Sequence, residues 1–221
     1  MNVPTENLAI KLRKFNRICP ITGYQEGSIR LGAPVIVQTD RGIEYGEITE
    51  FPLGLPKALS KDVRLKKVVR YATAQDVDKA SLLPEMEIEG VKIAGQLARE
   101  LELPIKIIDV EYLFDTNRLT VYYKVAEGKK VKTLRDLARD ISAKLKSRVD
   151  MKQLTPRDEA RIYGGLGPCG KSLCCSTWLE KPRHVTVKMV KEQGLAMSPT
   201  KTSGMCGRLM CCLEYEYEQK K

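Results

Sequence analysis

The feature that most constrains this sequence is a cysteine motif that occurs twice near the C-terminus. The first copy reads CGKSLCC and the second CGRLMCC, and each cysteine of the first has a counterpart 37 residues later. Since cysteine is a rare residue, two such motifs at one constant offset indicate a structural repeat. Six of the seven cysteines lie in these motifs, within 44 residues: Cys169, Cys174, Cys175, Cys206, Cys211 and Cys212.

The first copy also matches the phosphate-loop pattern G-x-x-x-x-G-K-S/T, from Gly165 to Ser172. The second copy has Leu209 in place of Ser172, so the hydroxyl that would bind magnesium has no counterpart. Pro168 offers no N–H, and only the short run ARIY precedes the loop, where a phosphate loop needs a buried strand. The pattern therefore favours a thiol site over a nucleotide site.

Thiolates are the natural ligands of zinc and of iron–sulfur clusters, and four close either site. Vicinal cysteines point in different directions, so we expect each copy to give two thiolates to one centre and a third elsewhere. One arrangement is a four-cysteine site with the remaining two cysteines packed as small apolar residues: Cys169, Cys174, Cys206 and Cys211, with Cys175 and Cys212 left over. In the other arrangement each copy gives three thiolates to an incomplete cluster, which a partner protein completes.

Zinc is the main chemical rival of a cluster, because the C-x4-C half of each motif suits a zinc knuckle. Disulfides are favoured only in an oxidising compartment. We expect Lys171 and Arg208 to lower the pKa values of the nearby thiols. Cys19 is predicted to be a buried free thiol, and His184, the single histidine, a surface or satisfied residue. No arrangement of residues for acid–base or nucleophilic catalysis stands out, so we do not expect an enzyme.

The composition predicts a cytoplasmic globular protein, whose positive charge fits either an acidic partner or ordinary solubility. The chain has 221 residues and a formal charge of +10, and no apolar run approaches a membrane span or a signal peptide. The densest basic run extends from Lys57 to Arg70. As a strand it would form a solvated face, and the alternative function is an RNA-binding protein with a structural zinc site.

The predicted fold class is α+β in three parts. Residues 1–60 form a small β-rich unit with a hairpin in 30–50, 61–155 an α+β domain, and 156–221 a Cys-rich metal-cluster module packed on the rest. The domain is expected to be an antiparallel sheet with helices on one face. Its predicted elements are a strand at 63–71, helices at 74–83 and 86–101 separated by Pro84, a hairpin at 110–125, a helix capped by Thr133, and a strand at 148–154.

Three smaller expectations concern the C-terminal module. Asp158 and Glu159 are predicted to lie at a helix start and to cap it. Trp178 is expected to shield the cysteine region rather than to stack on a base. The terminal run EYEYEQKK is interpreted as a solvated end.

The segments GGLGPCGKSLCCSTWL and VKMVKEQGLAMSPTKTSGMCGRLMCCLEYE resemble the signature of the bacterial RicT (YaaT) family, which has the polymerase-suppressor-type C-terminal domain. The segments DVEYLFDTNRLTVYY and IRLGAPVIVQTDRGIEYGEI are also similar, so the resemblance covers most of residues 30–217. It implies a non-enzymatic cytoplasmic protein that carries 4Fe-4S clusters and assembles with small helical YlbF/YmcA-type partners. It also implies regulation of RNA processing by the membrane-associated endoribonuclease Y, with any link to RNA indirect. The family's cluster cysteines map onto the six motif cysteines.

Overall fold

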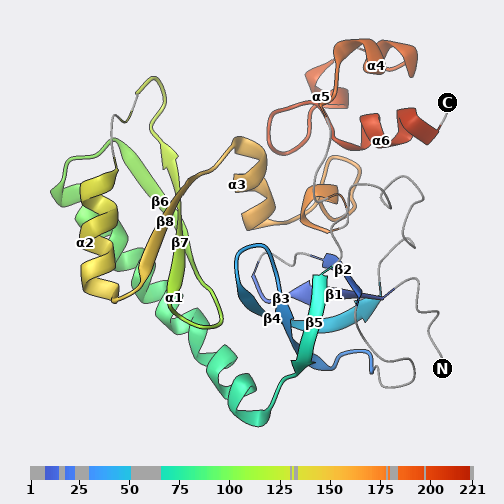
Figure 1. Cartoon of the computed structure of the whole chain (residues 1–221). Coiled ribbons are helices and arrows are strands. Elements are labelled where there is room, and N and C mark those ends of the chain that lie inside the picture. Colours follow the sequence, from blue (N-terminus) through green and yellow to red (C-terminus); the bar gives the residue numbers. More distant parts are fainter. Residues whose placement is uncertain are drawn as a thin grey trace.

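The computed structural model describes residues 8–14, 18–22, 30–50, 66–129, 131, 134–177, 179, 184–196 and 198–219. Figure 1 shows a small barrel near the N-terminus, a sheet with two helices beside it, and a helical module that carries the C-terminus. The α+β class predicted from the sequence is confirmed. Within the described residues, no helix is both long and apolar enough to cross a membrane.

A closed five-stranded barrel forms the N-terminal unit, in the order β1-β2-β5-β3-β4. Its strands are β1 Leu8–Leu12, β2 Ile18–Thr22, β3 Pro34–Gln38, β4 Ile43–Glu50 and β5 Lys66–Tyr71. Ile10, Val35 and Val37 fill its core, each almost fully buried. The hairpin expected in residues 30–50 is confirmed as β3 and β4.

The predicted strand at 63–71 is present from residue 66, and residues 51–65 lie outside the described part of the chain. The domain boundary expected at residue 60 places this strand in the following domain. It instead pairs with β2 and β3, because its edge is needed to close the barrel. β5 therefore belongs to the N-terminal unit.

One continuous helix, α1 Ala74–Glu100, replaces the two helices expected on either side of Pro84. It begins at a capping box in which Thr73 and Asp76 exchange hydrogen bonds. A proline inside a helix costs roughly 3 kcal/mol. The buried stripe continues across Pro84 along the whole helix, and its burial outweighs that cost. The stripe consists of Ala80, Leu83, Glu87, Gly90, Ala94, Leu97 and Ala98.

A three-stranded sheet of order β6-β7-β8 packs against α1 and α2. Its elements are β6 Ile105–Tyr112, β7 Arg118–Val125, α2 Arg135–Leu145 and β8 Arg148–Gln153. The β6–β7 hairpin is antiparallel as expected, but β8 pairs with β7 in parallel. The sheet is mixed rather than antiparallel because α2 acts as a crossover between these two strands.

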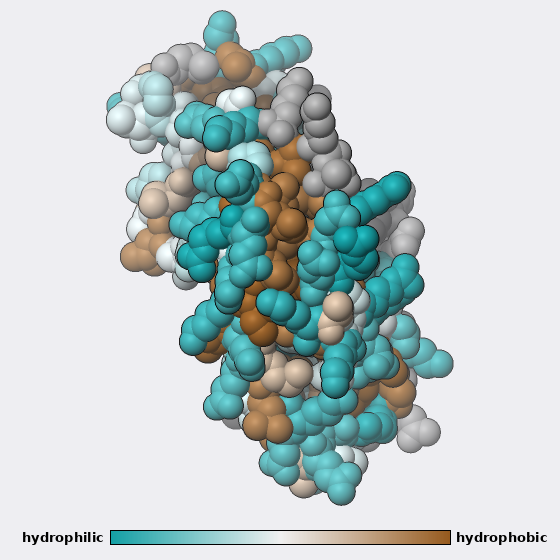
Figure 2. Space-filling view, turned by 90° about the vertical axis from the view of Figure 1, so that its left-hand side faces the viewer, coloured by the Kyte–Doolittle hydropathy of each residue, from teal (hydrophilic) through white to brown (hydrophobic). Residues whose placement is uncertain are grey.

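Both helices bury their apolar residues in one core with the sheet, as predicted. Leu97 of α1 and Leu137 and Ile141 of α2 meet Leu119 and Val121 of β7 in that core. The expected cap Thr133 lies outside the described residues, and the residue that precedes α2 in the structure is Leu134. On the side of the molecule that carries α2, hydrophilic residues surround a narrow apolar strip (Figure 2).

The C-terminal module consists of short helices that follow β8. They are α3 Pro156–Tyr163, η2 Cys174–Ser176, α4 Val187–Glu192, α5 Pro199–Thr202 and α6 Cys212–Gln219. The capping role expected at Asp158 is confirmed by a capping box with Thr155, whereas Glu159 pairs with Lys124. The terminal run predicted to be solvated instead begins inside α6. Glu214 is buried there, because α6 packs beside α4.

Candidate metal centre

Two loops of the same form carry the cysteine motifs. In the first loop the Gly167 N–H donates to the Lys171 carbonyl at 2.8 Å, and in the second the Gly204 N–H donates to the Arg208 carbonyl at 2.8 Å. Each loop also contains one isolated antiparallel bridge, and the two bridges are again 37 residues apart. The repeat in the sequence is therefore a repeat of backbone structure.

The glycine that follows the first cysteine allows each loop to turn. Gly170 has φ 73° and Gly207 has φ 71°, in the left-handed region that favours glycine. Their N–H groups donate to the carbonyls of Gly167 and Gly204 at 2.9 Å. These internal bonds use N–H groups that a phosphate loop would direct at its ligand. The first loop also follows helix α3 rather than a strand, so the structure gives no support to a nucleotide site.

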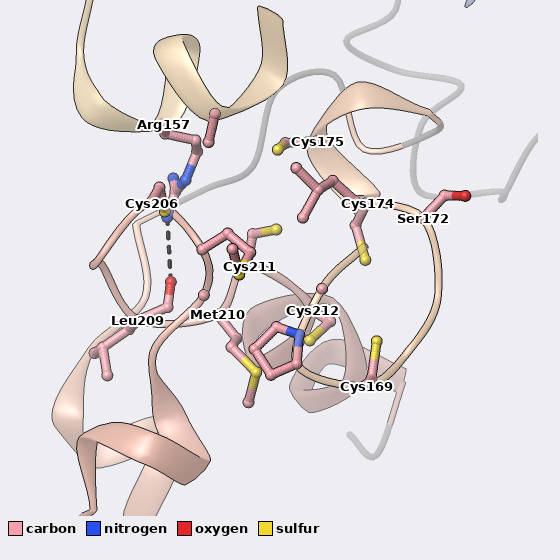
Figure 3. Close-up of a pocket in the computed structure, with 16 residues that line it drawn as sticks. Arg157, Cys169, Ser172, Cys174, Cys175, Cys206, Leu209, Met210, Cys211 and Cys212 are labelled. Atoms are coloured by element: carbon pink, nitrogen blue, oxygen red, sulfur yellow. Dashed lines mark hydrogen bonds between the residues drawn. The ribbon is translucent and has the colours of Figure 1, made fainter. Parts of the chain in front are cut away.

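The two loops meet around one cavity of about 60 Å³ (Figure 3). All six motif cysteines line it, so the structure brings together every residue of the predicted site. Leu173, Leu209 and Met210 add apolar surface, and Arg157 of α3 lies at the edge. A largely apolar cavity with six sulfur atoms is suited to bind a soft metal or a cluster.

The six thiols differ in how far they are open to solvent. Cys169 is exposed, Cys175 is buried, and the other four are half-buried. Cys174 and Cys175 lie in η2, and Cys212 begins α6. All seven cysteines of the chain are free thiols, and Cys19 is buried in the barrel core as predicted.

Burial is the main reason why four of these thiols are hard to ionise. It raises the pKa of Cys211 to about 12, with a further contribution from the charges of Cys174 and Cys175. It raises the pKa of Cys212 to about 11 in the same way, with Cys174 the next cause. The pKa values of Cys174 and Cys175 are also raised, first by burial. The lowering expected from Lys171 and Arg208 is therefore wrong for these four thiols.

The cations that favour the thiolate forms of Cys175 and Cys211 come from α3, a helix that was not expected to belong to the site. Burial still raises both pKa values, but the positive charges of Arg161 and Arg157 partly offset this rise for Cys175, and Arg157 partly offsets it for Cys211. Arg157 donates a hydrogen bond from Nη2 to the Leu209 carbonyl at 3.3 Å, which connects α3 to the second loop. The positive charges thus lie on the helix behind the cavity, whereas Lys171 and Arg208 are exposed.

The spacing of the donors bears on which kind of centre they fit. Among the described residues, no three His, Cys, Asp or Glu side chains are grouped closely enough to hold one metal ion. Tetrahedral zinc, with Zn–S bonds near 2.3 Å, would bring its sulfurs to within about 4 Å of each other. The six thiols that line the cavity are ligands suited to zinc and to iron–sulfur clusters alike.

His184 is exposed and does not line the cavity, in agreement with its predicted surface role. Trp178, expected to shield the cysteines, lies outside the described residues.

Two family models match parts of this chain. The PSP1 C-terminal conserved region matches residues 66–154, and the third domain of PSP1-like proteins matches residues 184–220. A curated relative, stage 0 sporulation protein YaaT of Bacillus subtilis, is 38% identical over 192 residues. The chain belongs to the RicT (YaaT) family.

The match to the Bacillus subtilis protein covers 84% of this chain and 66% of that relative, so the chain spans just under two thirds of the relative's length. An uncharacterized protein of Schizosaccharomyces pombe is 28% identical over 92 residues, which is 42% of this chain and 12% of that protein. No solved structure matches this RicT-family chain. The first family model begins with β5 and ends just after β8, and the second includes the second cysteine loop.

Proposed function

We propose that this protein is a non-enzymatic cytoplasmic regulator that holds iron–sulfur clusters in its cysteine cavity. In this proposal it assembles with small helical YlbF/YmcA-type proteins and modulates RNA processing by endoribonuclease Y. The observation that carries the proposal is that six cysteines from two equivalent loops line one cavity. The sporulation role in the name of the Bacillus subtilis relative supports a regulatory rather than a metabolic role.

The cysteine cavity supports a cluster through its donors and its surroundings. Thiolates are the usual ligands of iron–sulfur clusters, and a cluster there would supply redox and oxygen sensitivity. The exposed Cys169 leaves one side of the site open to solvent and to a partner protein. The arginines of α3 offset negative charge on the other side.

The alternative of direct RNA binding through the basic strand gains no support from β5. Lys66 donates to Asp40 at 2.9 Å, and Arg70 is paired with Asp76. These ion pairs use part of the positive charge that phosphate groups would need. We therefore keep the cluster-holding regulator as the proposed function.

The test is a measurement of iron, acid-labile sulfide and zinc in protein purified without air, alone and with a YlbF/YmcA-type partner. We expect iron and sulfide together with the broad visible absorption of an iron–sulfur cluster. Cys19→Ala is the matched control, since this cysteine lies in the barrel core and its loss leaves the iron content unchanged. Stoichiometric zinc with no iron would instead identify a zinc scaffold.

A further inference from the structure

Only one face of the three-stranded sheet packs against α1 and α2. Leu119 and Val121 of β7 are buried in the core with these helices, and Val149 and Met151 of β8 pack against that core. Since side chains alternate along a strand, the residues between them point to the opposite face, which we call the basic face. The exposed residues of β7 and β8 on the basic face are Arg118, Lys124, Arg148, Asp150 and Lys152.

The cations of the basic face lie beside one another across the strands. Arg118 of β7 is the register partner of Arg148 in the parallel strand β8. At the other end of β7, Lys124 is the register partner of Lys106 in β6, which is also exposed. With Lys152 of β8, these cations extend along β7 from residue 118 to residue 124, a length of about 20 Å at roughly 3.3 Å per residue.

Few of these cations have an acidic partner within the described part of the chain. Lys124 pairs with Glu159 of α3 at 2.8 Å, and α3 lies on the other side of the strands from α2 (Figure 1). Lys152 Nζ lies 5.7 Å from the centroid of the Tyr122 ring, which holds this ammonium group at the surface. The remaining cations form no ion pair with a described residue: Lys106, Arg118 and Arg148.

The barrel neutralises two carboxylates that share the basic face. Glu111 of β6 accepts hydrogen bonds from Arg41 at 2.6 and 2.8 Å, and Asp109 pairs with Lys14 at 2.9 Å. Asp150 of β8 is the exposed acid that remains on these strands. The basic face therefore presents a net positive charge to solvent, in contrast to β5, where the cations are paired.

The side chains of the basic face suit a polyanion better than a folded protein. Among the described residues, none of the exposed large apolar side chains belongs to β6, β7 or β8. Protein interfaces are anchored by apolar and aromatic residues and are depleted in lysine, whereas nucleic-acid backbones are bound mainly through Lys and Arg. Tyr122 is buried, so it cannot stack on a base. The chemistry favours contact with phosphate groups, independent of base sequence.

We propose that the basic face binds the phosphate backbone of a nucleic-acid strand. Arg118 and Arg148 are the central contacts, because a guanidinium group can donate two hydrogen bonds to one phosphate. Lys106 and Lys152 add point charges on either side. This inference goes beyond the proposed function, which needs no direct contact with RNA, and it does not depend on the cysteine cavity.

Two double variants with the same loss of charge test the proposal, by fluorescence anisotropy of a short labelled single-stranded RNA with the full chain. R118Q/R148Q removes two cations of the basic face. We expect roughly tenfold weaker binding and a salt dependence shallower by about 1.4, since each phosphate contact of a single strand contributes about 0.7. K92Q/R99Q removes two exposed cations from α1, on the helical side of the sheet, and should bind as tightly as the wild type. DNA of the same sequence should behave like the RNA.

Three results would overturn the proposal. Equal weakening in both double variants would show that only the net charge of the chain matters. The wild-type protein might equally show no binding at low salt, which would remove the ligand altogether. Stronger competition by polyglutamate than by unlabelled RNA, at equal concentrations of negative charge, would identify an acidic protein as the partner instead.

A single substitution with the opposite effect completes the test. Asp150→Asn removes the carboxylate between Arg148 and Lys152, and we expect it to tighten RNA binding about threefold. Glu85→Gln, on the exposed side of α1, removes the same charge and should leave the affinity unchanged. Iron content is measured on the same samples. If the protein holds no iron but still binds RNA through the basic face, the proposed cluster function fails while this inference stands.

Discussion

Gly46 of β4 lies opposite Leu12 of the neighbouring strand β1, and the barrel has no room there for a larger residue. A Cβ atom at this position would lie 2.4 Å from Ile10 Cγ2 and 2.9 Å from the Lys11 carbonyl oxygen. We therefore expect Gly46→Ala to lower the free energy of unfolding by about 1–3 kcal/mol, because the backbone of β1 cannot move away without breaking its pairing. Urea unfolding followed by circular dichroism measures this change.

Gly95 provides a matched control for that substitution. It lies inside α1, and a Cβ atom there would meet nothing within 4 Å. Gly95→Ala should raise the unfolding free energy by roughly 0.5–1 kcal/mol, since alanine favours a helix more than glycine does. Equal effects of the two substitutions would mean that close packing at Gly46 does not limit the barrel.

At the residue scale, the repeated motif was enough to predict the cysteines of the site and the glycine turn of each loop. The repeat identified all six cysteines of the cavity, and the glycine kept in both copies corresponds to a turn with positive φ. Arg157 and Arg161 were missed because their role depends on where α3 packs. The only local signal is that both lie on α3, which ends just before the first motif.

At the scale of elements, Pro84 tests whether α1 is one helix. It is exposed, so its replacement removes no packing, and alanine restores the N–H that a continuous helix uses. We expect Pro84→Ala to raise the unfolding free energy by up to about 3 kcal/mol. Chemical denaturation and the far-ultraviolet helix signal measure the gain.

Pro156 is the control for Pro84, because it lies in the first turn of α3, where proline suits the helix. Pro156→Ala should give no gain in stability. If Pro84→Ala also gave none, α1 would be two helices with a break at residue 84, as the sequence alone suggested.

The sequence predicted most of these elements but not how all of them pair. The hairpins depend on alternating side chains and nearby turns, and both are present. The predicted break at Pro84 was wrong. Proline disfavours a helix locally, but the buried residues of α1 lie on both sides of Pro84 and stabilise one continuous helix. The parallel pairing of β8 was missed, although a helix between two neighbouring strands is the usual sign of a parallel crossover.

At the scale of the whole molecule, a buried carboxylate joins the barrel unit to the sheet unit. Glu87 of α1 accepts hydrogen bonds from Arg13 and Lys14, which follow β1, and from the N–H of Tyr112 in β6. Its side chain is only 4% exposed. Glu87→Ala should lower the unfolding free energy by about 3 kcal/mol, because Arg13 loses its carboxylate partner while Lys14 keeps Asp109.

Glu85→Ala, on the exposed side of the same helix, serves as the control and should change stability by no more than about 0.5 kcal/mol. Thermal unfolding of both variants measures the difference. A Glu87→Ala protein as stable as the control would show that this carboxylate does not hold the two units together. No local sequence pattern indicates this link, since its residues are up to 99 positions apart.

The internal hydrogen bonds of the two cysteine loops have a consequence for how quickly the cavity can be filled. Each loop keeps its shape through its own backbone, unlike a small zinc finger, which is unfolded without its ion. The conformational entropy of these loops is therefore lost when the chain folds rather than when a ligand arrives. Incorporation then requires little further ordering of the polypeptide, so its rate should be set by delivery and proton release.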